Sequence, residues 1–367
     1  MRKLCVVAAL LCSAHAAAAT AVWIDSDVSI GSPIREVDDA YALVLALHSP
    51  EIRIAGLSTT YGNAPLGHTG RAARDLVRRF GGSAGLKITD VYPGARSRSD
   101  LGRRTAASDA LAAELEKRKL VYIALGPLTN LATFLQHYPH LAPRLERVIF
   151  LGGVAPGTSL AFGRNRSFRI HDANVFKDPD ATEAVLRSRI PITLLPVGTV
   201  SNLQFDAGDL RRLEQSGGAA NYLARRSRIW LWFWTRVVRE NGGAIFDAPA
   251  VVEVVKPELL SMARRFAAMD RKGNLVVTRR PAKGARSVRY CTALAPGTKQ
   301  FVMRRLLARP RITGKGDLKS PSAVANRRSL KGRQRATIEM LERSADSISS
   351  AFSSRSVLPA SMATTRR

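Results

Sequence analysis

Five carboxylates lie close together in the stretch WIDSDVSIGSPIREVDDAYALVLAL, near the start of the chain. They are Asp25, Asp27, Glu36, Asp38 and Asp39. Like charges packed together raise the free energy of a folded chain unless a positive group lies among them. Converging carboxylates supply the oxygen ligands that hard divalent cations prefer, and Ca²⁺ accepts more oxygens and looser geometry than Mg²⁺. A cation held there would lower the pKa of a bound water and orient sugar hydroxyls.

Helix capping is the alternative explanation for part of this cluster. Asp38 is placed to cap the helix that the following residues predict, and Asp39 would then be stabilised by the positive end of that helix. This arrangement accounts for one or two acids. It leaves Asp25 and Asp27, at the end of the preceding strand, without an explanation, so both hypotheses stay open at this point.

Short apolar strands that alternate with helical patterns must position these acids. The predicted strands are 20–25, 52–60, 121–125, 147–153, 191–197, 274–280 and 286–294, and the predicted helices are 38–49, 68–80, 106–120 and 298–309. Such alternation is typical of a single large α/β domain with an open, mostly parallel (mixed) sheet and helices on both faces. The last two strands are expected to pair with each other. Ligands of such sheets bind beyond the carboxyl ends of the strands, where the acidic cluster falls.

Both ends of the chain differ from this pattern. Residues 1–19 combine Arg2 and Lys3 with an apolar stretch and small residues, as in a cleavable signal peptide, so we expect an exported protein that is periplasmic or secreted. The domain is expected over residues 20–310. Residues 311–367 are basic and Ser-rich, with too few apolar residues to offset the entropy of ordering them, which predicts a mobile tail or, alternatively, a basic tether to anionic surfaces.

The basic composition does not by itself indicate a nucleic-acid-binding protein. The formal net charge is +28, but Arg and Lys are spread along the whole chain, and no helix-turn-helix, zinc-finger or RNP motif is present. We therefore expect no specific nucleic-acid partner, only weak and salt-screened attraction. No segment is long and apolar enough to predict a membrane span. Once the signal is removed Cys291 is the remaining cysteine, so no intramolecular disulfide is expected.

Several motifs continue the pattern that the acidic cluster begins. They are DSDV…VDDA, STTYGNAPL, ALGPLTNLA, VIFLGG, DANVFKDPDA and FDAPAVV. In these motifs the chain resembles the nucleoside hydrolase family, the inosine–uridine-preferring N-ribohydrolases, from Val22 to Leu307 and in the same order. The resemblance implies hydrolysis of the N-glycosidic bond of ribonucleosides, with Ca²⁺ as cofactor and a small-molecule nucleoside as substrate. It leaves open a homo-oligomer, since such relatives are often dimers or tetramers.

The resemblance also implies roles for individual residues. The implied calcium ligands are Asp27, Asp39, the backbone carbonyl of Leu125 and Asp247. The implied substrate-binding residues are Asp38, Asn63, Asp172, Asn174 and Asp247. Asp27 would in addition be the general base, and Asp172 stands where the family has Glu. Asp25 is expected to orient groups that touch the cation.

The family's chemistry explains why these residue types are needed. Cleavage of an N-glycosidic bond leaves oxocarbenium-like positive charge on the ribose, which nearby carboxylates stabilise. A cation that holds the ribose hydroxyls and a water adds a positional benefit. Asp27 would stay ionised beside the cation and accept a proton at neutral pH.

Two departures from the family pattern concern the pocket. Residues 28–37 stand where the family has a much shorter connection, and we expect this insertion to bulge outward and reshape the mouth of the pocket. Glu36 is expected to be a solvated loop residue, although it is within possible reach of the substrate. Phe246 stands where many purine-cleaving relatives have a His that protonates the leaving base. Phe246 has no proton to donate, and His171 is the nearest alternative acid by sequence.

These departures leave two functions to separate. The first is a calcium-dependent hydrolase, and the second is a catalytically silent nucleoside- or sugar-binding protein of the same fold. The aromatic stretch RIWLWFWTRVV at residues 228–238 predicts a core or subunit-contact helix, with stacking of a base on Trp232 or Trp234 as the alternative.

Overall fold

The computed structural model describes residues 19–32, 34–155 and 158–308 of the 367-residue chain. The predicted C-terminal tail and all of the predicted signal peptide except Ala19 lie outside these residues and stay predictions. Among the described helices, none has the length and apolar character that crossing a membrane requires.

A nine-stranded sheet forms the centre of the molecule, with the strand order β12-β11-β13-β8-β5-β4-β1-β2-β3. Its strands are β1 (Thr20–Ser26), β2 (Ile52–Thr59), β3 (Val91–Pro93), β4 (Leu120–Ala124), β5 (Leu145–Leu151), β8 (Ile192–Leu195), β11 (Leu260–Met269), β12 (Leu275–Thr278) and β13 (Arg286–Leu294). The strands from β3 to β8 pair in parallel, as does β8 with β13, while β11 runs antiparallel to both β12 and β13. The predicted open, mostly parallel sheet is confirmed.

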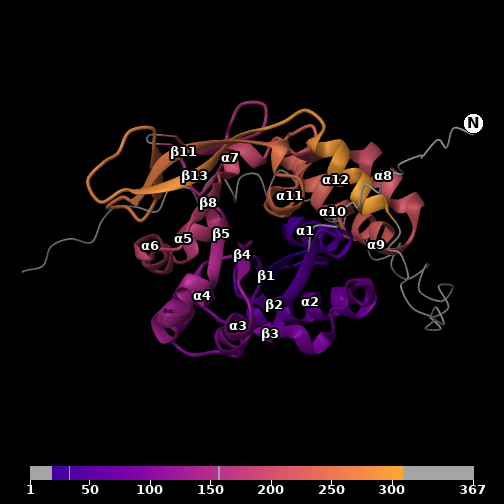
Figure 1. Cartoon of the computed structure of the whole chain (residues 1–367). Coiled ribbons are helices and arrows are strands. Elements are labelled where there is room, and N and C mark those ends of the chain that lie inside the picture. The colour runs from indigo at the N-terminus through magenta and orange to yellow at the C-terminus, as the bar shows by residue number, and fades with distance from the viewer. Residues whose placement is uncertain (1–18, 33, 156–157, 309–367) are drawn as a thin grey trace, which may run out of the picture.

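Helices cover both faces of this sheet (Figure 1). They are α1 (Asp38–Leu47), α2 (Leu66–Phe80), α3 (Ala106–Lys117), α4 (Thr129–His137), α5 (Ala173–Lys177), α6 (Pro179–Arg187), α7 (Val197–Val200), α8 (Ala207–Ser216), α9 (Gly218–Arg226), α10 (Arg228–Trp232), α11 (Ala248–Val255) and α12 (Thr298–Leu307). A π-helical turn over Phe233–Val237 continues α10. In Figure 1, α3, α4 and α6 lie on one side of the sheet, and α1, α11 and α12 lie on the other.

Alternation along the central strands divides the core in two. Val22 and Ile24 of β1 belong to the cluster under α1 and α11, whereas Trp23 between them belongs to the cluster under α3 and α4. Successive side chains of a strand point to opposite faces, so a strand covered on both faces must be apolar at nearly every position. β4 fits this rule, since all of its residues are buried.

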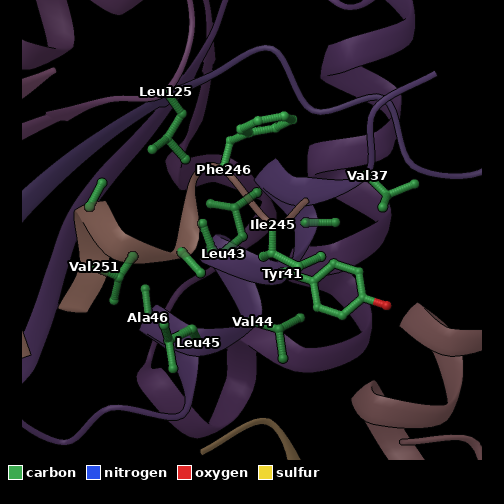
Figure 2. Packing of buried hydrophobic residues seen from close by; sticks show 14 of the residues in the cluster. Val37, Tyr41, Leu43, Val44, Leu45, Ala46, Leu125, Ile245, Phe246 and Val251 are labelled. Carbon is green, nitrogen blue, oxygen red and sulfur yellow. The ribbon is translucent and has the colours of Figure 1, made fainter. Parts of the chain in front are cut away.

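The first helix after β1 is buried along its whole length. Every residue of α1 is buried, including Asp38 and Asp39 in its first turn. Figure 2 shows Leu43, Val44 and Leu45 of this helix packed among the buried side chains that include Val251 of α11. The packing fixes the N-terminus of α1 at the edge of the sheet and leaves the two aspartates at most 4% exposed.

One predicted strand pairing is wrong. The segments 274–280 and 286–294 do form strands β12 and β13, but β11 lies between them and pairs with each. β11 was not predicted because its partly exposed residues, among them Arg264 and Arg265, give neither a continuous apolar run nor a clean alternation. Its place in the sheet follows from the neighbouring strands rather than from its own pattern.

A glycine on β2 allows the close packing of the buried Trp23 ring. A Cβ atom at Gly56 would overlap that ring, which is 0% exposed and hydrogen-bonded to Ser58. We expect Gly56→Ala to lower the free energy of unfolding by roughly 1 to 3 kcal/mol, because a well-packed core has no room for an added carbon. Urea denaturation measures the change. Gly82→Ala is the matched control, since a Cβ there meets nothing within 4 Å, and equal stability of the two variants would contradict the packing argument.

Candidate active site

A cavity of about 240 Å³ opens beyond the carboxyl ends of β1, β4 and β5. Glu36 and His171 contribute to its polar lining, together with five further residues, which are Asp38, Asn63, Asp172, Asn174 and Asp247. These five are the substrate-binding residues implied by the sequence. A groove of about 1210 Å³ beside α8 and α12 is larger, but none of the predicted site residues lines it. The small cavity is therefore the candidate active site on chemical grounds.

Three buried carboxylates meet at the floor of this cavity. Oxygens of Asp38, Asp39 and Asp247 lie within 4.8 Å of one another, and these side chains are at most 4% exposed. Asp38 and Asp39 come from the start of α1, and Asp247 directly precedes α11. Oδ1 of Asp38 and Oδ1 of Asp247 are buried and accept no hydrogen bond from the described residues. Buried carboxylate oxygens without partners are costly, so this cluster fits a metal ion.

Asp27 lies beside this cluster and is joined to it by Asn63. The backbone N–H of Asn63 donates to Oδ2 of Asp27 at 2.6 Å, and its amide donates to Asp27 at 3.3 Å and to Asp39 at 3.1 Å. Gly62 permits this approach, because a Cβ there would overlap the Asp27 carboxylate. Asp27, Asp39 and Asp247 thus converge as the sequence implies, although the tightest group of three contains Asp38 in place of Asp27.

A lysine that sequence reasoning missed lies next to Asp27. Nζ of Lys177 is 3.7 Å from Oδ2 of Asp27, and its side chain is 23% exposed. Lys177 follows Asn174 by three positions on α5, a spacing that places two side chains on the same side of a helix, so the motif DANVFKDPDA contained a signal for it. Lys177 supplies part of the positive charge that the acids need.

The predicted carbonyl ligand and the remaining predicted sugar-binding residues also line the cavity. Leu125 follows β4, and its carbonyl accepts a hydrogen bond from the Asn174 amide at 2.9 Å. A carbonyl has a second lone pair, so this bond leaves it able to bind a cation. Oδ2 of Asp172 accepts the Gly153 N–H at 2.6 Å, and its Oδ1 is buried without a partner among the described residues.

Asp25 supports the site through its backbone rather than through its side chain. Its side chain accepts hydrogen bonds from Ser58 at 2.6 Å and from Asn130 at 2.8 Å, which joins β1 to β2 and α4. Its carbonyl accepts the N–H of Leu125 at 2.8 Å. The described contacts therefore orient the segment that carries the Leu125 carbonyl, and the Asp25 carboxylate binds none of the other aspartates.

Electrostatics make the acid cluster unfavourable without a cation. Burial raises the pKa of Asp27, Asp38, Asp39 and Asp247, and neighbouring carboxylates raise the pKa of the last three further. The Lys177 ammonium opposes the shift at Asp27. Carboxylates this close cannot all be ionised at neutral pH unless positive charge is added.

The prediction that Glu36 is solvated is wrong. Glu36 is half-buried, lines the cavity, and accepts a hydrogen bond from the indole N–H of Trp230 at 2.7 Å. Burial raises its pKa to about 7, and the hydrogen bond from the Trp230 N–H lowers it. A hydrogen bond between Ser32 and His68 also holds the insertion. Ile34 and Glu36 of the insertion line the cavity. Sequence reasoning missed this because Trp230 lies 194 positions away.

Aromatic side chains form the far end of the cavity. They are Phe168, Phe233, Trp234 and Phe246. Trp234 is 2% exposed and packs against Phe246 with a ring-centroid distance of 5.9 Å, whereas Trp232 does not line the cavity and packs against the core. His171 lines the cavity but is exposed and stacks on Phe176 at 4.4 Å. The far end is thus suited to a flat, largely apolar ring.

Comparison with known proteins identifies the family of the chain. Residues 22–300 match the model of the inosine-uridine preferring nucleoside hydrolases, so the chain belongs to that family, as the sequence motifs predicted. It is a hydrolase that acts on N-glycosyl compounds.

Individual relatives are distant in sequence. Pyrimidine-specific ribonucleoside hydrolase RihA of Salmonella paratyphi C (strain RKS4594) is 23% identical over 265 residues, which cover 64% of this chain and 82% of the relative. Uridine nucleosidase 1 of Arabidopsis thaliana is 23% identical over 266 residues, covering 65% of this chain and 76% of the relative. Among solved structures, the plant nucleoside hydrolase PpNRh1 aligns with a TM-score of 0.65 at 22% identity, covering 78% of this chain and 97% of that one. The purine-preferring ribonucleoside hydrolase from Gardnerella vaginalis aligns with a TM-score of 0.65 at 21% identity, covering 78% and 98%.

The buried Asp25 makes stability depend on pH. Burial raises the pKa of Asp25 from 3.8 to about 6, so the folded protein binds this proton more tightly than the unfolded chain does. Stability from this group is fully present below pH 3.8 and is lost as the pH rises to about 6. Between pH 4 and pH 7 we expect the wild type to lose about 2 kcal/mol more stability than Asp25→Asn, which has no carboxyl group to titrate at this position. Urea denaturation with a chelator present measures this, and parallel pH dependence of the two proteins would refute it.

Proposed function

We propose that the protein hydrolyses the N-glycosidic bond of ribonucleosides with Ca²⁺ as cofactor and releases free base and ribose. The observation that carries this proposal is the buried acid cluster at the floor of a cavity whose far end is aromatic. One end therefore suits a sugar with several hydroxyls and a reacting carbon, and the other suits a flat ring. A nucleoside has these two parts in this order.

The donor set favours calcium over other divalent ions. The proposed ligands are all oxygens, and they are Asp27, Asp39, the Leu125 carbonyl and Asp247. Ca²⁺ takes six to eight oxygens in flexible geometry, while Mg²⁺ demands a near-ideal octahedron. When bound, Ca²⁺ would neutralise the carboxylates, lower the pKa of a water and hold the ribose hydroxyls.

The chain's own residues would divide the remaining work. Asp27 would accept a proton from the attacking water, and Asn63 would hold its carboxylate in position through two hydrogen bonds. The buried carboxylates would stabilise the positive charge that develops on the ribose as the bond to the base breaks. Asp38, Asn174 and Asp247 would bind the ribose hydroxyls. Asp172, shorter by one methylene than the family's Glu, would bind the sugar less closely or through water.

The proposal includes export of the protein from the cytoplasm. Residues 1–19 have the charged start, apolar centre and small residues of a signal peptide. This supports export, with action on nucleosides in the periplasm or the medium. Immunodetection of the full-length protein in cell fractions tests it.

Turnover of a nucleoside panel tests the enzyme directly. We expect the mature protein to release free base from at least one ribonucleoside, with loss of release on chelation and recovery on addition of Ca²⁺. Asp27→Asn should lower kcat by roughly a hundredfold or more, because it removes the general base. Chromatography of the free base measures this. Asp180→Asn, at an exposed position on α6, is the matched control. Nucleoside binding without any release of base would instead support a catalytically silent binding protein.

Calcium affinity tests the role of Lys177. Its ammonium lies 3.7 Å from the Asp27 carboxylate, so a cation that binds Asp27 must work against it. We expect Lys177→Met to lower the Kd for Ca²⁺ by about tenfold, equivalent to about 1.4 kcal/mol. Isothermal titration with Ca²⁺ alone measures this without any substrate. Lys272→Met, at an exposed position outside the cavity, should leave the Kd unchanged. An unchanged or weaker affinity in Lys177→Met would contradict the competition.

A further inference from the structure

The aromatic end of the cavity contains two polar groups on its inner wall. One is the carboxyl group of Glu36, which the insertion brings into the wall, and the other is the indole N–H of Trp234. Exposed His171 also lines the cavity, but most of the surrounding wall is aliphatic or aromatic, as at Phe168 and Phe246. Polar groups that are few and fixed determine the orientation and specificity of a ligand in an otherwise apolar pocket.

Glu36 is held in one position. Its Oε2 accepts the Trp230 N–H at 2.7 Å, and Trp230 is 1% exposed. Gly243 leaves room for the Trp230 ring, because a Cβ at that position would overlap it. The other oxygen, Oε1, accepts no hydrogen bond from the described residues. It is also not among their fully buried oxygens without a partner, so it is accessible from the cavity that Glu36 lines. Glu36 therefore presents one anchored oxygen and one acceptor that is available to a ligand.

Trp234 presents the complementary group. Its side chain is 2% exposed and lines the cavity, and its N–H has no hydrogen-bond partner among the described residues. The same N–H lies near the Glu36 carboxyl group. A buried donor without a partner costs roughly 1 to 3 kcal/mol, which an acceptor on a bound ligand would recover. The Glu36 carboxyl group and the buried Trp234 N–H thus lie near each other in the lining of the cavity.

We propose that Glu36 and Trp234 recognise the edge of the nucleobase, with Glu36 accepting a ring N–H and Trp234 donating to the adjacent carbonyl oxygen. Uracil and hypoxanthine present such an edge. The inference rests on the proposed function, since it assigns the aromatic end of the cavity to the base. It makes the insertion at residues 28–37 a determinant of substrate choice, because that loop carries Glu36. The ribose and the reacting carbon would lie against the cluster of Asp38, Asp39 and Asp247.

Methylated nucleosides test this recognition. Methylation at N3 of uridine or at N1 of inosine removes the N–H and leaves the ribose and the glycosidic bond in place. We expect the wild-type protein to prefer uridine over 3-methyluridine, or inosine over 1-methylinosine, by roughly tenfold or more in both Kd and kcat/KM. In Glu36→Gln the side-chain carbonyl keeps the bond from Trp230 and turns the NH₂ group toward the base, so the preference should fall to about twofold or less.

Controls separate this inference from the fold and from the proposed function. Glu183→Gln, at a surface position on α6, should retain the wild-type preference, and thermal unfolding should show that each variant is folded. If the wild type releases no base but binds the unmethylated nucleosides more tightly, the proposed hydrolysis fails and the recognition stands. Equal binding of methylated and unmethylated nucleosides by the wild type overturns the inference. An unchanged preference in Glu36→Gln overturns it as well, and so does a failure to bind any of the four nucleosides.

Discussion

Repulsion among buried carboxylates is the constraint on which the site depends. Asp38, Asp39 and Asp247 meet within 4.8 Å in a place that water scarcely reaches. Uncompensated buried charge costs several kcal/mol per ion, a large share of the 5 to 15 kcal/mol that stabilises a typical domain. Ser26, which donates to Asp39 at 2.5 Å, and the positive end of α1 reduce that cost in part. The buried oxygens without partners that remain fit the ligand set of a divalent cation.

The sheet makes this unfavourable arrangement possible by fixing where its strands end. β1 and β4 are buried on both faces, so neither can slide to separate the acids without exposing apolar side chains. The buried helices α1 and α11 deliver Asp38, Asp39 and Asp247 to the same edge. Rigid packing therefore carries the strain that function requires, in line with the general pattern that local rules are broken at functional sites.

The local sequence pattern predicted most strands of the sheet and most carboxylates of the acid cluster, because both depend on short runs of sequence. The strand over Thr20–Ser26 and the helix over Asp38–Leu47 follow from periodicity, and the carboxylates follow from their place at the junction. Strand β11 was not predicted, because Arg264 and Arg265 interrupt its hydrophobic pattern. The hydrogen bond of Glu36 was not predicted because Trp230 lies far from it along the chain. The position of Lys177 three residues after Asn174 was a local signal that it lies at the site, but its contact with the distant Asp27 was not encoded locally.

The insertion and the substitution at Phe246 belong to one change in the pocket. Phe246 places an apolar ring where the family pattern has a polar histidine, and its ring packs against Trp234. Glu36 enters the same cavity from the loop before α1 and takes a hydrogen bond from Trp230. The cavity therefore has a polar group from the insertion and an apolar ring at the position where the family pattern has a polar one. Because the acidic floor keeps the family motifs while this wall departs from them, the proposed function assigns the reaction to the floor and the choice of base to the wall.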